Sequence, residues 1–329
     1  MSAGVDLAAI RAAAARIAPH IRITPAMPDP VLSGRLGQPV TLKLEHRQET
    51  GAFKLRGATN AVLSLPEKVL ARGVVTASTG NHGRAMAHAA RARGARAVVC
   101  LSRLVPANKV AAIRALGAEV RIVGESQDAA MEEVARAVAH DGMAEIPPFD
   151  HPDVVAGQGT LGLEIVGRCP AVETVLVPLS GGGLAAGVAA AVKALRPGVR
   201  VIGISMERGA AMAASLAAGH PVALREMPTL ADSLGGGIGA RNALTFAMCR
   251  ALLDDVVLLS EAEIAEGIRH MHRVTGDAVE GAAAVGAGAL LAGKVVPVGE
   301  TVVISSGCNI EPALHARIMA GANSLEDAP

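Results

Sequence analysis

The stretch TVLVPLSGGGLAAGVAAAVKAL, residues 174–195, decides the fold class of this chain of 329 residues. It begins as a run of β-branched and apolar residues, passes through three consecutive glycines, and continues as an Ala-rich segment of helical character. The order strand, glycine turn, helix is the repeating unit of α/β proteins. A continuously apolar strand is typical of a parallel sheet that is covered on both faces.

The same alternation of short apolar runs and longer helical segments recurs along the chain. Gly94 and Gly117 follow two of the helical segments, where a left-handed C-cap favours glycine. The order predicts an α/β protein with mainly parallel sheets and right-handed crossovers. Strands are predicted over Val40–Glu45, Val74–Ser78, Ala97–Leu101, Val120–Val123, Thr174–Leu179, Val199–Ser205, Val256–Leu259 and Thr301–Ser305. Helices are predicted over Leu55–Leu65, His82–Arg93, Ala107–Leu116, Gln127–His140, Gly183–Leu195, Glu261–Val274 and Gly281–Leu291.

Composition and charge disfavour several classes of function. The formal net charge is +1 without a basic or acidic block, so nucleic acids and membrane surfaces are not expected as partners. The chain has no Trp or Tyr and only three Phe, too few for a base-stacking surface. Its four cysteines form no CxxC pair, and the N-terminal segment lacks the apolar core of a signal peptide. A cytoplasmic protein with reduced thiols, no membrane span and no metal site is therefore expected.

Lys54, in the segment TGAFKLRGA of residues 50–58, is a candidate nucleophile. A lone lysine near a helix start is usually a solvated surface residue. Lys54, however, follows Phe53 and precedes the predicted helix Leu55–Leu65, whose first turn is electropositive. A lysine that is partly buried in that place would have a lowered pKa and could act as an amine nucleophile.

Three further motifs lie at the ends of predicted strands. STGNHG, residues 78–83, is either a helix N-cap or a carboxylate site, because free backbone N–H groups and hydroxyls suit both. SGGG, residues 180–183, either lets the backbone approach a phosphate or forms only a tight turn, and it matches neither GxGxxG nor a Walker motif. SSGCN, residues 305–309, ends the last predicted strand. Such ends of strands and starts of helices are where open α/β sheets bind ligands.

Taken in order, AFKLRGA, STGNHG, SGGGL and SSGCN resemble the motifs of the fold-type II pyridoxal-phosphate (PLP) enzymes, specifically the serine/threonine dehydratase and serine racemase family. HIRITP and VTLKLEHRQETG are similar to the N-terminal segment of that family, so the resemblance covers nearly the whole chain. STGNHGRA, MERGAAM and SLGGGIG resemble in particular the dehydratase of hydroxyectoine utilisation.

The resemblance implies a tryptophan synthase β-like fold with two domains. The large, PLP-binding domain would be discontinuous, with residues 1–62 and 147–329, and the small domain would comprise residues 63–146. The Pro-rich stretch EIPPFDHP, Glu145–Pro152, is a candidate for one crossing between them. The family also implies a homodimer.

Roles for individual residues follow from the same resemblance. Lys54 would hold PLP as a Schiff base and later move the Cα proton. Phe53 would pack beside the ring, Asn81 would hydrogen-bond the ring hydroxyl, and Ser306 would meet the pyridine nitrogen. The backbone N–H groups expected to hold the phosphate are those of Ser180, Gly181, Gly182, Gly183 and Leu184.

The implied reaction removes ammonia from a small β-hydroxy amino acid and leaves a 2-oxo acid. PLP would supply the electron sink, and a hydroxyl rather than an Asp at the pyridine nitrogen favours loss of the β-hydroxyl over transamination. Serine, threonine, a hydroxyaspartate and a hydroxyectoine-derived acid are all admissible substrates. The residues expected around the substrate carboxylate are Ser78, Thr79, Asn81 and His82.

Four positions depart from the family pattern or allow two interpretations. Cys308 replaces a glycine, either as a tolerated small hydrophobe or as an altered pocket wall. Thr79, a second candidate catalytic residue, stands where racemases carry a serine that reprotonates the opposite face, and its methyl group disfavours that role. Ser205 stands where metal-dependent relatives place a Glu, so a Mg or Ca site is not expected. Glu280 is either a dipole partner of the helix Gly281–Leu291 or, by resemblance, a neighbour of the cofactor.

Two alternatives stay open beside the dehydratase. One is an amino-acid racemase acting on serine or aspartate. The other is a protein without chemistry that binds a nucleotide through the turn at residues 180–183.

Overall fold

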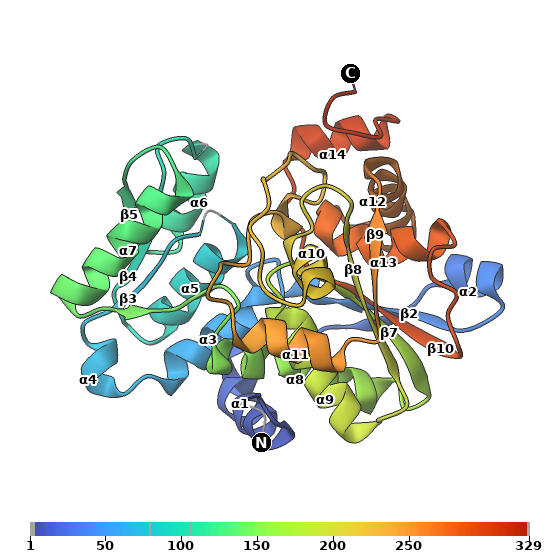
Figure 1. Cartoon of the computed structure of the whole chain (residues 1–329), viewed down its shortest axis with the longest axis horizontal. Coiled ribbons are helices and arrows are strands. Elements are labelled where there is room, and N and C mark those ends of the chain that lie inside the picture. Colours follow the sequence, from blue (N-terminus) through green and yellow to red (C-terminus); the bar gives the residue numbers. More distant parts are fainter. Residues whose placement is uncertain (1–3, 79, 106, 328–329) are drawn as a thin grey trace.

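The computed structural model describes residues 4–78, 80–105 and 107–327, and their strands form two sheets (Figure 1). The larger sheet has six strands in the order β1-β2-β10-β7-β8-β9. β1 pairs antiparallel with β2, and the remaining pairs are parallel. The fold is therefore α/β with mainly parallel sheets, as predicted. The six strands span β1 Ala26–Pro28, β2 Val40–Leu44, β7 Val172–Pro178, β8 Arg200–Met206, β9 Asp255–Leu259 and β10 Glu300–Ser305.

The smaller sheet has four parallel strands in the order β5-β4-β3-β6. All four come from residues 74–145, whereas every strand of the larger sheet lies before or after that range. This separation supports the predicted domains, whose boundaries near residues 62 and 147 stay a prediction. The strands span β3 Val74–Thr76, β4 Ala97–Leu101, β5 Glu119–Ile122 and β6 Ala144–Glu145.

Helices cover both faces of the six-stranded sheet because its central strands are apolar on both faces. Along β10, Val302 and Ile304 belong to the core on one face and Val303 to the core on the other. The first face is covered by α1 Leu7–Ile17, α8 Pro152–Arg168, α9 Gly183–Leu195, α10 Ala211–Ala218 and α11 Leu244–Leu252. The second face is covered by α2 Pro30–Leu36, α12 Glu261–Thr275, α13 Gly281–Leu291 and α14 Pro312–Met319.

The four-stranded sheet also lies between two layers of helix. α5 Asn81–Ala92 and α6 Ala107–Ala115 pack on one face, and α7 Gln127–Asp141 packs on the other. α3 Lys54–Ser64 contacts both α5 and α8, so it joins the two halves of the molecule (Figure 1). Among the helices that the structure describes, none has the length and apolar composition needed to span a bilayer. The short helices are α4 Glu67–Leu70, η1 Ala18–His20, η2 Glu45–Arg47 and η3 Asp232–Leu234.

α8 is not among the helices predicted from the sequence pattern, and its glycines have low helix propensity. The structure shows why they are there. A Cβ at Gly157 would lie 2.6 Å from the Arg56 carbonyl oxygen in α3, and one at Gly162 would lie 2.7 Å from Ala191 Cβ in α9. The glycines therefore let α8 pack closely against its two neighbours, and tertiary contact outweighs local propensity.

Buried ionic groups fix the first turn of α3. The Arg56 guanidinium donates to both carboxylate oxygens of Glu45, at 2.7 and 2.8 Å, and to Glu164 at 2.6 Å. Lys43 Nζ also donates to Glu164, at 2.6 Å, and Arg56, Glu45 and Lys43 are fully buried. Because every charge has an opposite partner, the network holds β2, α3 and α8 in one arrangement.

Arg56→Met is expected to lower the free energy of unfolding by roughly 3–5 kcal/mol, because it leaves the Glu45 carboxylate buried without its main donor. Urea denaturation followed by circular dichroism measures the loss. Arg136→Met is the matched control, because Arg136 pairs with Glu133 on an exposed helix face. The urea concentration at the midpoint of unfolding of this variant should equal that of the wild type. Equal midpoints for the two variants would contradict the structural role of Arg56.

Candidate active site

One cavity borders the carboxyl ends of β7 and β10 and the N-termini of α3, α5 and α9. All of the residues predicted to bind a cofactor line this cavity, although they come from four separate motifs. They are Phe53, Lys54, Asn81, Ser180, Gly181, Gly182, Gly183, Leu184 and Ser306. Five residues to which sequence reasoning gave no role also line it: Pro178, before the glycine turn, Ser233 and Leu234 of the SLGGGIG motif, and Phe149 and Ala282.

Lys54 is the first residue of α3, and its amine is buried. The Nζ atom donates to the carbonyl oxygen of Pro148 at 2.7 Å and lies 5.3 Å from the centroid of the Phe53 ring. Burial lowers the pKa of Lys54 to about 8, against the opposing effect of the Glu280 charge. A substantial fraction of the amine is therefore neutral near physiological pH, as an amine nucleophile requires.

The turn Gly181–Gly183 brings bare backbone to the opposite part of the cavity. Gly182 has φ of 88°, in the left-handed region that favours glycine, and α9 begins at the next residue without a side-chain cap. A Cβ at Gly181 would lie 2.3 Å from the Phe149 ring. The Gly181 carbonyl oxygen accepts a hydrogen bond of 2.8 Å from Thr245 Oγ1, which fixes the turn from behind. The free N–H groups at this helix start suit a phosphate.

Glu280 is the N-cap residue of α13, but its side chain makes no hydrogen bond to that helix and instead lines the cavity. Its carboxylate accepts from Asn81 Nδ2 at 2.9 and 3.2 Å and from the Asn309 N–H at 3.1 Å. Burial, and secondarily the Asp232 charge, raise the pKa of Glu280 to about 7. The sequence could have predicted this burial. The segment of α13 is apolar on all sides, so the helix is buried and a charged residue at its start lies in the protein interior.

Asn309 connects this carboxyl group to the surface side of α5. Its Nδ2 donates to Asn81 Oδ1 and its Oδ1 accepts from Arg84 Nη1. Sequence reasoning named the SSGCN motif but gave no role to Asn309 or Arg84. Their placement means that the amide of Asn81 is held on both sides by protein groups.

Of the residues predicted around a carboxylate, Asn81 lines the Lys54 cavity, whereas Ser78 and His82 are not among its lining residues. Ser78 lines a neighbouring cavity of about 490 Å³ together with Glu226, Thr229 and Asp232. His82 is buried, and its Nε2 lies 2.8 Å from the Ile146 carbonyl oxygen, so Nε2 carries the hydrogen. Burial, together with the Lys54 charge, lowers the pKa of His82 to about 3, so its ring is neutral. Thr79 lies outside the described residues.

Cys308 packs behind the cavity and is not among its lining residues within the described chain. Its N–H donates to the Gly51 carbonyl oxygen at 2.9 Å, and a Cβ at Gly51 would lie 2.9 Å from its Sγ. This placement favours a tolerated small hydrophobe over an altered pocket wall.

The family model described as "Pyridoxal-phosphate dependent enzyme" matches residues 17–307 of the chain. A protein of Sinorhizobium fredii that is provisionally named a threonine dehydratase is 59% identical over 318 residues, which are 96% of each chain. The L-threonine ammonia-lyase of Thermotoga maritima is 39% identical over 289 residues, covering 88% of this chain and 72% of that protein. Among solved structures, maize serine racemase superposes with a TM-score of 0.91 at 32% identity, over 96% of this chain and 97% of that one.

Glu280→Gln is expected to move the titration of the Lys54 amine to lower pH. The Glu280 carboxylate stabilises the Lys54 ammonium ion, so an uncharged amide in its place lowers the pKa of Lys54 below about 8. The rate of reductive methylation of Lys54, followed by peptide mass spectrometry across pH 6–9 in cofactor-free protein, measures this shift. Glu263→Gln, in the first turn of α12 where Glu263 pairs with Lys294, should leave the profile unchanged. A profile of Glu280→Gln that stays in place or moves to higher pH would disprove the coupling.

Proposed function

Because this chain belongs to the pyridoxal-phosphate dependent enzymes and is a threonine/serine dehydratase-like lyase, we propose that it eliminates the β-hydroxyl of a small hydroxy amino acid and releases ammonia. Its fold is that of the fold-type II enzymes, and its cofactor is pyridoxal 5'-phosphate. The observation that carries the proposal is the buried amine of Lys54, with a lowered pKa, in one cavity with the bare glycine turn.

The residues of the cavity fit this cofactor. An amine that is partly neutral suits an aldehyde carbon, and a turn without room for any Cβ suits a phosphate. We assign the aldehyde to Lys54, the phosphate to the N–H groups of residues 180–184, the ring hydroxyl to Asn81 and the pyridine nitrogen to Ser306, with Phe53 beside the ring. When bound, the cofactor supplies an electron sink that makes the Cα–H bond of an amino acid acidic.

Lys54 is the group proposed to move the Cα proton. Its neutral fraction can accept the proton, and the Glu280 carboxylate then stabilises the ammonium ion that results. His82 is unsuited to proton transfer because its N–H is committed to the Ile146 carbonyl oxygen and its ring stays neutral. The different surroundings of Lys54 and His82 therefore make Lys54, and not His82, the group suited to accept the proton.

The substrate carboxylate is assigned to the start of α5. The N-cap residue of this helix is Gly80, which has no side chain to occupy the first N–H groups, and they are available to an anion. Ser78 precedes this turn, and His82 helps to hold the turn against residue 146. The predicted role of Thr79 as a catalytic or carboxylate-binding residue is kept as part of the proposal.

The negative charge of the cavity that Ser78 lines favours some of the admissible substrates over others. Glu226 and Asp232 line it, and Glu280 lies close enough to Asp232 for the charge of Asp232 to raise its pKa. A substrate with a second carboxylate, such as hydroxyaspartate, would meet this negative charge. Serine, threonine or a cationic hydroxy acid is therefore favoured, and STGNHGRA, MERGAAM and SLGGGIG support a place in hydroxyectoine breakdown.

An amino-acid racemase is the second candidate, supported by the similarity to maize serine racemase. We further propose a cytoplasmic homodimer, on the resemblance to the family. The nucleotide-binding alternative is not retained, because the chain belongs to an enzyme family with its own cofactor.

Lys54→Ala is expected to lower kcat/KM by roughly 10²–10⁴-fold or more, because it removes both the covalent attachment and the proposed base. The same variant should lose the visible band that borohydride discharges in the wild type. Lys68→Ala, at an exposed position of α4, is the control and should keep both properties. A borohydride-sensitive band that persists in Lys54→Ala would place the attachment at another lysine.

A panel of L-serine, L-threonine and the β-hydroxyaspartate stereoisomers, scored for ammonia and 2-oxo acid, tests the substrate class. The kcat/KM for serine and threonine should exceed that for hydroxyaspartate by roughly tenfold or more. The double variant Glu226→Gln, Asp232→Asn should reduce this ratio of kcat/KM values. Preference for hydroxyaspartate would overturn the charge argument. Formation of the opposite enantiomer without ammonia would establish the racemase instead.

A further inference from the structure

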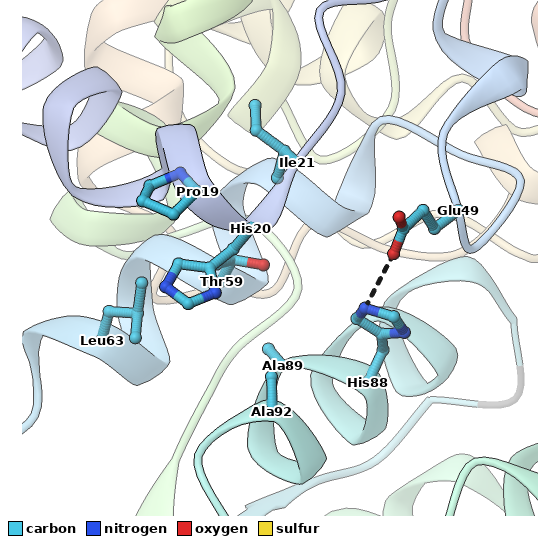
Figure 2. Close-up of a pocket in the computed structure, with 9 residues that line it drawn as sticks. All are labelled: Pro19, His20, Ile21, Glu49, Thr59, Leu63, His88, Ala89 and Ala92. Carbon is cyan, nitrogen blue, oxygen red and sulfur yellow. Dashed lines mark ion pairs between the residues drawn. The ribbon is translucent and has the colours of Figure 1, made fainter.

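Two further cavities differ in their relation to the Lys54 cavity. One, of about 230 Å³, lies between α3 and α5 (Figure 2). The carboxylate of Glu49, which lines it, is already paired, since Oε2 lies 3.3 Å from His88 Nε2 and Oε1 lies 3.5 Å from Arg22 Nε. The other, of about 490 Å³, is the cavity that Ser78 lines. This second one, the Ser78 cavity, bears on the choice of substrate.

The short helix η3 separates the Ser78 cavity from the Lys54 cavity. Asp232 of η3 lines the Ser78 cavity, whereas the next two residues, Ser233 and Leu234, line the Lys54 cavity. Ser78 itself comes two residues before the N-cap of α5, the helix start to which the substrate carboxylate is assigned. A side chain that extends from the Cα of such a substrate past η3 therefore enters the Ser78 cavity.

The Ser78 cavity is larger than serine or threonine requires. Its volume lies within the ~300–1,000 Å³ of pockets for drug-sized ligands, whereas threonine adds only a methyl group at the β-carbon. Part of the lining is apolar, namely Met227, Pro228 and Leu325. Met227 is 43% exposed, and open apolar surface at a cavity is suited to contact an apolar part of a ligand. The cavity therefore suits an apolar β-substituent larger than methyl.

Residues 324–327 bring Leu325 to this cavity. Within this segment, Ser324 Oγ donates to Asp327 Oδ1 at 2.8 Å, and the Asp327 N–H donates to Ser324 Oγ at 3.2 Å. The Arg317 guanidinium, from α14, donates to the carbonyl oxygen of Leu325 at 3.1 Å and also to that of Asp327. The turn and its guanidinium donor together fix the backbone on both sides of Leu325.

Arg208 joins this segment to another part of the cavity wall. Its Nη1 lies 3.4 Å from Glu326 Oε1 and 3.5 Å from the carbonyl oxygen of Pro228, which also lines the cavity. The side chain of Leu325 is half-buried and packs against the core on the second face of the six-stranded sheet. Leu325 is thus held through its backbone, its neighbour in sequence and its own packing.

We propose that residues 324–327 form an outer wall of the substrate site and that Leu325 is a specificity-determining residue, which contacts an apolar β-substituent larger than methyl. The proposal rests on the proposed function and names its substrate class, the β-hydroxy amino acids with an aliphatic substituent of two or more carbons at the β-carbon. Serine has no such group and does not reach Leu325. The contribution of Leu325 to binding therefore rises from serine through threonine and 3-hydroxynorvaline to 3-hydroxyleucine.

Dissociation constants of amino acids without the β-hydroxyl test this wall in the holoenzyme, because these ligands cannot undergo the elimination. L-alanine, L-2-aminobutyrate, L-norvaline and L-leucine have side chains of increasing length, and their binding at the cofactor is read from its visible spectrum. Leu325→Ala should weaken L-leucine by about tenfold and leave L-alanine unchanged, because methylene groups in an apolar pocket add to binding. Arg317→Met, which frees the segment, should weaken L-leucine in the same direction.

Leu314→Ala is the matched control. Leu314 is half-buried and packs against the same core as Leu325, but it is not among the described lining residues of the Ser78 cavity. All four dissociation constants should therefore stay those of the wild type. Equal weakening of L-leucine by Leu314→Ala and Leu325→Ala would assign the effect to core packing and overturn the role of Leu325.

The reacting series gives a second measurement. Leu325→Ala should raise the KM for L-3-hydroxyleucine by about tenfold with little change in kcat, because the contact is the same in the ground state and the transition state. The kinetic constants for serine should not change. A variant that alters kcat for all four hydroxy amino acids by one factor would overturn the proposal.

Two results of the binding series would also overturn it. They are an absence of L-leucine binding to the wild type, and dissociation constants that Leu325→Ala changes by the same factor for all four ligands or for none. Failure of the proposed function is read separately, as an absence of ammonia from every hydroxy amino acid. The binding series still tests the wall in that case, since it requires no elimination.

Discussion

The placement of one buried amine is the constraint on which the rest of the structure depends. Lys54 begins α3, and two residues later the Arg56 guanidinium is held by Glu45 from η2 and Glu164 from α8. The first turn of α3 therefore cannot shift without separating buried opposite charges. Because α3 also packs on α5, the same network positions Asn81 relative to Lys54.

Burial then acts differently on the pKa values of the amine and of the two ionisable groups near it. It lowers the pKa of Lys54 to about 8, raises that of Glu280 to about 7 and lowers that of His82 to about 3. A cation, an acid and a neutral ring thus lie together with distinct capacities to take or hold a proton. The low dielectric environment, rather than any unusual residue type, sets these three pKa values.

The chain that crosses from the small sheet to α8, residues 146–151, connects these parts. The carbonyl oxygens of Ile146 and Pro148 accept from His82 and Lys54, and the Phe149 ring lies against the glycine turn. The Asp150 carboxylate accepts from the N–H of Thr245, at the start of α11. One short segment therefore contacts the Lys54 amine, His82 at the start of α5 and the glycine turn at residues 181–183, so a movement between the two sheets would alter all three contacts.

The sequence by itself determined the alternating strands and helices, the α/β class and the motifs that supply part of the lining of the Lys54 cavity, because the period of apolar residues, glycine turns and ordered motifs are local properties. Tertiary structure alone decided the glycine-rich helix α8, whose propensity is poor but whose close contacts with α3 and α9 need the missing side chains. It also decided that Glu280 lies in the cavity and accepts hydrogen bonds from Asn81 and Asn309, and that Thr59 and His88 line one cavity. These groups are distant along the chain, and only packing, which removes water and brings charges together, determines their pairing and their protonation.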